Sequence, residues 1–107
     1  MAKDIRIRVT IDNTKNTARI TIRGDLTGAT GKKLLETYTK YSTNKQLHLE
    51  LNFDEKCYIN SGGIAYLIDI ATSAKKANQK IKVTGLSDHF EKIFQMVGLT
   101  RCMELGE

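Results

Sequence analysis

The spacing of apolar residues changes along this 107-residue chain, and that change is the strongest constraint on its fold. From Asp4 to Ile11 and again from Thr17 to Arg23, apolar and polar residues alternate by two, the period of a strand with one buried face. Residues 12–16 between them are typical of a turn. The two stretches therefore predict a β-hairpin whose solvated face carries four arginines, Arg6, Arg8, Arg19 and Arg23.

Three later segments have helical spacing, in which apolar residues recur every three or four positions. They predict helices from Ala29 to Tyr41, from Asn60 or Ser61 onward, and from Ser87 to Gly98, with Thr27 as a candidate cap of the first. The apolar face of the second helix is expected to be buried, and it comprises Ile64, Leu67, Ile68, Ala71 and Ala74. Alternation predicts further strands at 46–52 and 80–84, and residues 101–105 can add a short edge strand.

This order of elements predicts an α/β fold with a mixed sheet of four to five strands. Three or more helices should pack mainly on one face, because right-handed crossovers carry them back over the sheet. The outer face of the first hairpin is then exposed or only partly covered. A chain of this length fits a single domain, residues 1–107, that can bury one core without disulfides or metal.

A polar, glycine-rich turn opens the second predicted helix. Asn60 and Ser61 are both good N-cap residues, and Gly62 and Gly63 follow directly. Glycine inside a helix costs about 1 kcal/mol relative to alanine, so something other than helix propensity holds the pair there. Either the bare backbone lets a partner or an anion approach closely, or the glycines let the helix pack tightly against a strand.

No catalytic or metal-binding arrangement stands out. His48 and His89 lie on different predicted elements, and Ser61 is not part of a nucleophile elbow. Cys57 and Cys102 are interpreted as free thiols. The net charge of +5 raises the question of nucleic acid, but the basic residues are scattered and no nucleic-acid signature occurs. We therefore expect a non-enzymatic protein with no cofactor and no direct nucleic-acid contact.

The N-terminus leads directly from Met1 into the first alternating segment, without an apolar signal region. No run of about 18 apolar residues follows anywhere in the chain. These two features predict a cytoplasmic protein that does not bind membranes.

Three motifs in order carry a family resemblance over nearly the whole chain. They are Gly24-Asp25-Leu26 before the first helix, the stretch from Tyr58 to Ile64 at the second, and the stretch from Phe94 to Leu99 at the third. Together they resemble the STAS domain of bacterial anti-sigma factor antagonists. The resemblance implies a STAS-like fold and a protein that binds an anti-sigma factor, itself a serine protein kinase, and so frees a sigma factor for transcription.

In that family, phosphorylation of an Asp-Ser-Ser/Thr-Gly motif on its third residue switches the antagonist off. Here Asn60 stands for the aspartate, Ser61 matches the first serine, Gly62 occupies the acceptor position and Gly63 matches the glycine. Since glycine has no hydroxyl, the resemblance predicts either an antagonist that binds constitutively or a switch moved to Ser61. A phosphoryl group would add nearly two negative charges to the interface.

We expect the partner-binding face to surround Asp25, Asn60, Ser61, Gly62 and Gly63, together with the start of the second helix. Two alternatives remain open: a scaffold or sensor subunit of a larger signalling assembly, and a small-ligand-binding module that uses the glycine turn. Homodimer formation is also left open.

Overall fold

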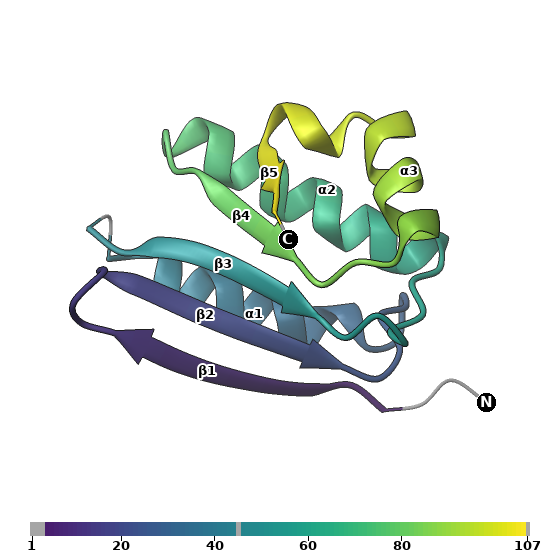
Figure 1. Ribbon diagram of the computed structural model, residues 1–107, viewed down its shortest axis with the longest axis horizontal. Coiled ribbons are helices and arrows are strands. Elements are labelled where there is room, and N and C mark those ends of the chain that lie inside the picture. The colour runs from purple at the N-terminus through teal and green to yellow at the C-terminus, as the bar shows by residue number, and fades with distance from the viewer. Residues whose placement is uncertain (1–3, 45, 107) are drawn as a thin grey trace.

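The predicted hairpin forms one edge of a five-stranded mixed sheet (Figure 1). The computed structural model describes residues 4–44 and 46–106. The strand order is β1-β2-β3-β4-β5; β1 is antiparallel to β2, and all the other neighbours are parallel. The strands are β1 (Arg6–Asp12), β2 (Thr17–Arg23), β3 (His48–Phe53), β4 (Ile81–Thr84) and β5 (Met103–Leu105).

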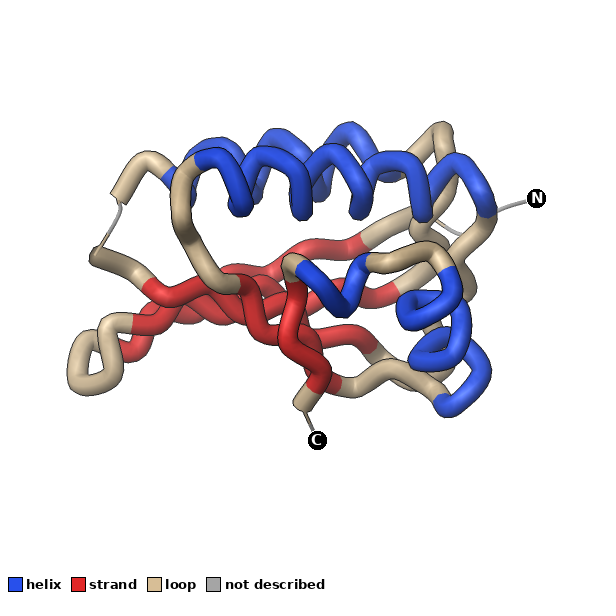
Figure 2. Tube along the Cα trace, turned by 90° about the horizontal axis from the view of Figure 1, so that it is seen from above, coloured by secondary structure: helices blue, strands red, loops and turns tan. Residues whose placement is uncertain are grey.

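The helices connect the parallel strands, as parallel pairing requires. They are α1 (Gly31–Ser42), α2 (Ser61–Lys76) and α3 (Asp88–Met96), and a 3-10 turn, η1 (Leu99–Arg101), precedes β5. Figure 2 shows the two long helices, α1 and α2, side by side on one face of the sheet. The shorter α3 lies near the end of the sheet toward which β3 and β4 point (Figure 1). The expected mixed sheet with helices mainly on one face is confirmed.

The core fills the space between the sheet and the helix layer. Side chains that alternate along the central strands supply one side of it, among them Ile20, Ile22 and Leu51, which are fully buried. Leu34 of α1 and Leu67 of α2, both fully buried, supply the other side from the helix layer. The opposite face of the sheet is polar, and there Arg19 of β2 forms an ion pair with Glu50 of β3, its cross-strand neighbour.

Two local predictions about the helices are wrong. Helix α1 begins at Gly31 with Thr30 in the N-cap position, so Thr27 is not its cap. On α2, Ile68 is 42% exposed, and Ile70 is buried in its place. The ridge of α2 that meets the sheet is therefore rotated slightly from the one that the apolar spacing indicated.

Residues 1–3, on which the expectation of no signal region partly rested, lie outside the described residues. Within residues 4–44 and 46–106, no helix has the length and apolar character needed to cross a membrane.

Candidate partner-binding site

The start of α2 is fixed by the side chain of Asn60. Its Oδ1 accepts a hydrogen bond from the backbone N–H of Gly63 at 2.9 Å, and its backbone is extended. Helix α2 therefore begins at Ser61, with Asn60 as the N-cap. The first turn contains no acidic side chain, so no carboxylate within that turn offsets the positive end of the helix dipole.

A short parallel bridge holds this helix start against the loop that follows β2. Leu26 pairs with Ile59: the Leu26 N–H donates to the Tyr58 carbonyl at 2.8 Å, and the Asn60 N–H donates to the Leu26 carbonyl at 3.1 Å. Since β2 and β3 are parallel neighbours, their carboxyl ends lie at the same end of the sheet. The bridge thus brings the Gly24-Asp25-Leu26 motif beside the second motif, as the predicted binding face requires.

The loop from Asp25 to Thr30 is itself held by side-chain hydrogen bonds. The Thr30 hydroxyl donates to the Asp25 carbonyl at 2.6 Å and accepts from the Thr27 N–H at 2.9 Å. The Thr27 hydroxyl accepts from the Ala29 N–H at 3.1 Å. Because both hydroxyls bridge the turn, the loop presents a fixed backbone to the start of α2.

The two glycines of α2 are explained by that close approach. A Cβ at Gly62 would lie 2.6 Å from the backbone nitrogen and 2.7 Å from the Cα of Gly28, closer than real Cβ atoms come. A Cβ at Gly63 would collide with the Leu26 carbonyl. The tight-packing interpretation of the pair is therefore confirmed, although the contact is with the loop after β2 and not with a strand.

The predicted residues differ in their access to solvent. Ser61 is exposed, Asp25, Asn60 and Gly62 are half-buried, and Gly63 is buried. Asp25 takes part in interactions within the chain. The side chain of Ser61 is therefore the most accessible group of the motif, whereas Gly63 shapes the surface from beneath it.

Exposed apolar side chains beside this motif were not predicted from the sequence. Tyr58 is 55% exposed and packs edge-on against Phe90 of α3, with ring centroids 6.4 Å apart. On α2, Ser61, Ala65 and Ile68 are all exposed. Their spacing of four and three residues places them on one stripe of the helix. The sequence carries no signal that separates this stripe from the buried face, because Ile68 also lies four residues after Ile64, at helical spacing.

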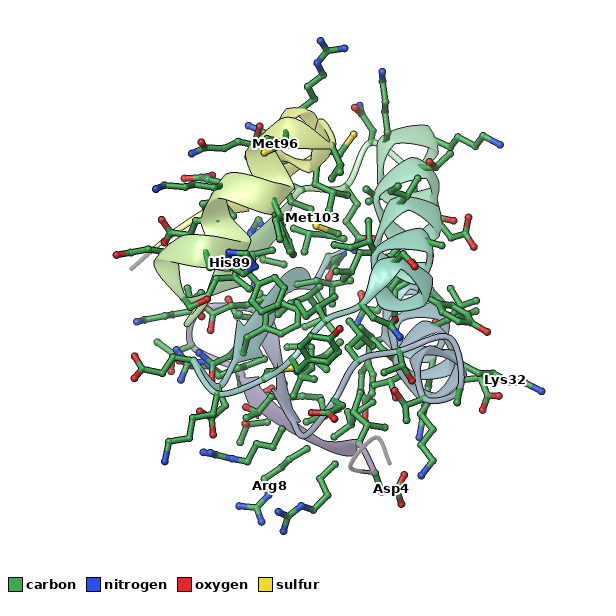
Figure 3. The ribbon with its side chains drawn as sticks, turned by 90° about the vertical axis from the view of Figure 1, so that its right-hand side faces the viewer. Asp4, Arg8, Lys32, His89, Met96 and Met103 are labelled. Carbon is green, nitrogen blue, oxygen red and sulfur yellow. The ribbon has the colours of Figure 1, made fainter. Side chains whose placement is uncertain are left out.

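A second exposed apolar group occurs at the end of α3. Met96 is 84% exposed and Val97 is 44% exposed. Figure 3 shows Met96 at the opposite end of α3 from His89. These exposed apolar side chains come from three segments: Tyr58 from the loop before α2, Ile68 from α2 itself, and Met96 and Val97 from the end of α3.

Two titratable groups near the site have shifted pKa values. Burial raises the pKa of the Cys57 thiol to about 11, and both cysteines are free, as predicted. The backbone N–H of Lys56 lowers the pKa of the half-buried Asp54, and Arg23 acts in the same direction from 2.9 Å. Within the described part of the chain, no group of His, Cys, Asp and Glu is arranged to hold a metal ion.

Comparison with known families assigns the class of protein. A family profile described as "Mlab, STAS domain" matches residues 9–106. The chain belongs to the STAS-domain family.

Two curated relatives, both named "Anti-sigma-B factor antagonist", come from Listeria monocytogenes serovar 1/2a (strain ATCC BAA-679 / EGD-e) and Listeria innocua serovar 6a (strain ATCC BAA-680 / CLIP 11262). Each is 23% identical to this chain over 86 residues, which cover 80% of this chain and 75% of the relative.

Two solved structures of SpoIIAA share the fold. One is described as the Bacillus cell fate determinant SpoIIAA in the phosphorylated form, and it matches with a TM-score of 0.65 and 13% identity over 95% of this chain and 92% of that one. The other is described as the anti-sigma factor antagonist SpoIIAA in its unphosphorylated form, with a TM-score of 0.68 and 14% identity over 95% and 89%.

Proposed function

We propose that this protein is an anti-sigma factor antagonist that acts by binding. It captures an anti-sigma factor of the serine kinase type and so frees a sigma factor for transcription. The family assignment and the names of the two Listeria relatives support the general role. The observation that carries the placement of the binding face is the exposed start of α2, where Ser61 is accessible beside half-buried Asn60 and Gly62.

The proposed contact surface consists of the loop around Asp25, the residues from Asn60 to Gly63, and the Ser61-Ala65-Ile68 stripe of α2. Its polar centre can form hydrogen bonds, and Tyr58 and Ile68 supply apolar area at its margin. Exposed aromatic side chains such as that of Tyr58 are common anchors in protein interfaces. Gly62 and Gly63 contribute by allowing the two segments of this surface to lie in contact.

We propose that regulation acts through Ser61. Gly62 occupies the family's acceptor position and has no hydroxyl, whereas the Ser61 side chain is exposed to an approaching kinase. A phosphoryl group on Ser61 would place nearly two negative charges at the centre of the contact surface, and these would have to be desolvated on binding. Binding of the anti-sigma factor should then be lost. If Ser61 is not modified, the antagonist binds constitutively.

Calorimetry with a purified anti-sigma kinase tests the binding face. The kinase is first identified by affinity capture from native extract with the wild-type chain. Ser61→Glu should weaken binding at least about tenfold, which corresponds to roughly 1.4 kcal/mol. Ser73→Glu is the matched control, because Ser73 is an exposed serine of the same helix about 18 Å further along its axis. Equal affinity of the two variants would refute the proposed face.

Mass spectrometry tests the proposed acceptor. The wild-type chain and Ser61→Ala are incubated with the captured kinase and ATP. Phosphate should appear on the peptide that contains Ser61 and should be absent from the variant. A wild-type peptide that stays unmodified, while the protein still binds the kinase, would reject the relocated switch and leave a constitutive antagonist.

A further inference from the structure

Among residues 4–44 and 46–106, no strand lies beside the outer edge of β1. β1 is the first strand of the sheet order, and within these residues it pairs only with β2 (Figure 1). Its seven residues run along one edge of the sheet. Backbone N–H and C=O groups on such an edge are ready to pair with another strand, and natural proteins often use charged side chains to discourage it. The arrangement of charges on β1 therefore decides whether this edge repels or attracts a partner.

The sequence of β1 is complementary to itself. When two copies of β1 run antiparallel with Val9 opposite Val9, Ile7 lies opposite Ile11 and Arg8 lies opposite Thr10. Arg6 then lies opposite Asp12, so that each copy contributes one cation and one anion to two symmetric pairs. Directly opposed side chains in an antiparallel pair have Cβ atoms about 4.5–5.5 Å apart, and opposite charges at that spacing stabilise the pairing.

Arg6 of β1 differs from the arginines of β2 in its ion pairing. Arg19 and Arg23 of β2 form ion pairs with Glu50 and Asp54, whereas Arg6 forms no ion pair with any residue in the ranges 4–44 and 46–106. Arg6 also lies opposite Arg23 in the strand register, a like-charge neighbour. A carboxylate approaching from the open edge would relieve that repulsion.

Asp12 can supply this carboxylate without losing its local role. Its Oδ1 accepts hydrogen bonds from the backbone N–H groups of Thr14 at 3.0 Å and Lys15 at 3.2 Å. These bonds fix the carboxylate at the end of β1 and leave its second oxygen for Arg6 of another copy.

The helix layer leaves the apolar side of β1 partly uncovered. Ile7 and Val9 are half-buried, and Ile11 is 48% exposed. An open hollow of about 1120 Å³ lies along this edge, and its lining includes Ile7 and Thr37 on the helix side and Arg8, Thr10 and Arg19 on the polar side of the sheet. A two-fold axis perpendicular to the sheet would keep Ile7, Val9 and Ile11 of both copies on the same face. There they would lie side by side and shield one another from solvent.

We propose that the β1 edge is a homodimer interface, in which two copies of this chain pair their β1 strands antiparallel about Val9 to form one continuous sheet. The symmetry of the pairing selects a second copy as the occupant, because an unrelated strand would have to match both the charges and the apolar positions. Figure 3 shows the labelled Arg8 side chain extending away from the body of the molecule at this edge. The start of α2 stays free, since it lies at the ends of β2 and β3 and not along β1.

Sedimentation equilibrium with charge-reversed variants tests the pairing. The wild-type chain should show a reversible monomer–dimer equilibrium. Arg6→Glu and Asp12→Lys each place two like-charge pairs in the homodimer, and each should weaken it about tenfold or more. An equimolar mixture of the two variants should recover dimer, because the heterodimer pairs the introduced glutamate with the introduced lysine, and the native Asp12 of one variant with the native Arg6 of the other. A monomeric wild type, or a mixture no more dimeric than its components, would overturn the proposal.

Disulfide trapping gives a readout that does not depend on charge. In a Cys102→Ser background, Val9→Cys places two thiols directly opposite each other, within the Cα separation that a disulfide needs. Ile7→Cys is the matched control, because its two copies would lie about 14 Å apart along the strands. The Val9→Cys variant should form a covalent dimer about tenfold faster or more under mild oxidation. Equal rates for the two variants would reject this register.

Discussion

Restoring a hydroxyl at the family's acceptor position, by Gly62→Ser, should destabilise this chain. The Cβ of the new serine would lie 2.6 Å from the backbone nitrogen of Gly28 and 2.7 Å from its Cα. Both atoms belong to the main chain, so no side-chain rotation can relieve the contact. The loop that carries Gly28 is also held in place by the Thr30 hydroxyl, which bonds to Asp25 and Thr27.

The size of the effect follows from two opposing contributions. Serine is a better helix former than glycine by about 0.5 kcal/mol, which favours the variant. Forcing extra atoms into a well-packed contact costs about 1–3 kcal/mol. The net loss should therefore be about 0.5–2.5 kcal/mol. For a urea m-value of about 2 kcal/mol/M, the unfolding midpoint would fall by about 0.3–1.3 M.

Urea unfolding of a double-mutant cycle with Thr30→Val tests this reasoning. Thr30→Val removes the hydroxyl that bridges the loop and should cost about 1–2 kcal/mol by itself. Once the loop is loosened, Gly28 can move away from residue 62, so the double variant should lose at least about 0.5 kcal/mol less than the sum of the single losses. A Gly62→Ser variant as stable as wild type, or losses that simply add, would refute the steric explanation of Gly62.

Three further predictions concern the cap, the buried thiol and the left-handed glycines. Asn60→Ala removes the N-cap of α2 and should lower the melting temperature by about 4–8 °C, equivalent to about 1 kcal/mol, in a circular dichroism melt; an unchanged melt would contradict the cap. The pKa of Cys57 is raised to about 11 in the folded chain, so the unfolded thiol loses its proton at lower pH. Stability measured by urea unfolding should therefore fall as the pH rises from about 9 towards 11, and more steeply in the wild type than in Cys57→Ala; parallel curves would contradict this. Gly85 and Gly98 have similar positive φ angles of 83° and 81°, but a Cβ at Gly85 would collide with a backbone carbonyl, whereas a Cβ at Gly98 would meet nothing within 4 Å. Gly98→Ala should cost about 1–2 kcal/mol and Gly85→Ala clearly more in the same assay, and equal losses would be the contrary result.

Local chemistry made the main elements predictable from the sequence. The alternation around Ile20 and Ile22 identified β2, and both residues are fully buried. The cap positions of α2 and α3 were also readable, since Asn60 bonds to Gly63 and Ser87 accepts from the Phe90 N–H at 3.3 Å. In each case the signal is local: the caps depend on a hydrogen bond between residues three positions apart, and the strand depends on an alternation that repeats every two residues.

The features that were missed depend on contacts between distant parts of the chain. Gly62 is required by Gly28, which lies 34 residues earlier and reaches it only through the bridge between Leu26 and Ile59. Ile68 and Ile70 are chemically identical, and only the rotation of α2 against the sheet decides which one is buried. A single sequence carries no direct signal for such a rotation, because both residues fit an apolar helix face within the 3.6-residue period.

A negative charge at Ser61 should have opposite effects on partner binding and on the stability of the fold. Ser61 is exposed, it is the first residue of α2, and the first turn of that helix has no acidic side chain. A negative charge placed there meets the positive end of the helix dipole, so Ser61→Glu should raise the free energy of unfolding by about 0.3–1 kcal/mol. The same charge lies at the centre of the proposed contact surface, where it must be desolvated before a partner can bind. Loss of binding together with equal or greater stability would therefore locate the effect in the interface. A Ser61→Glu variant that unfolds more easily than wild type would contradict this account of the site.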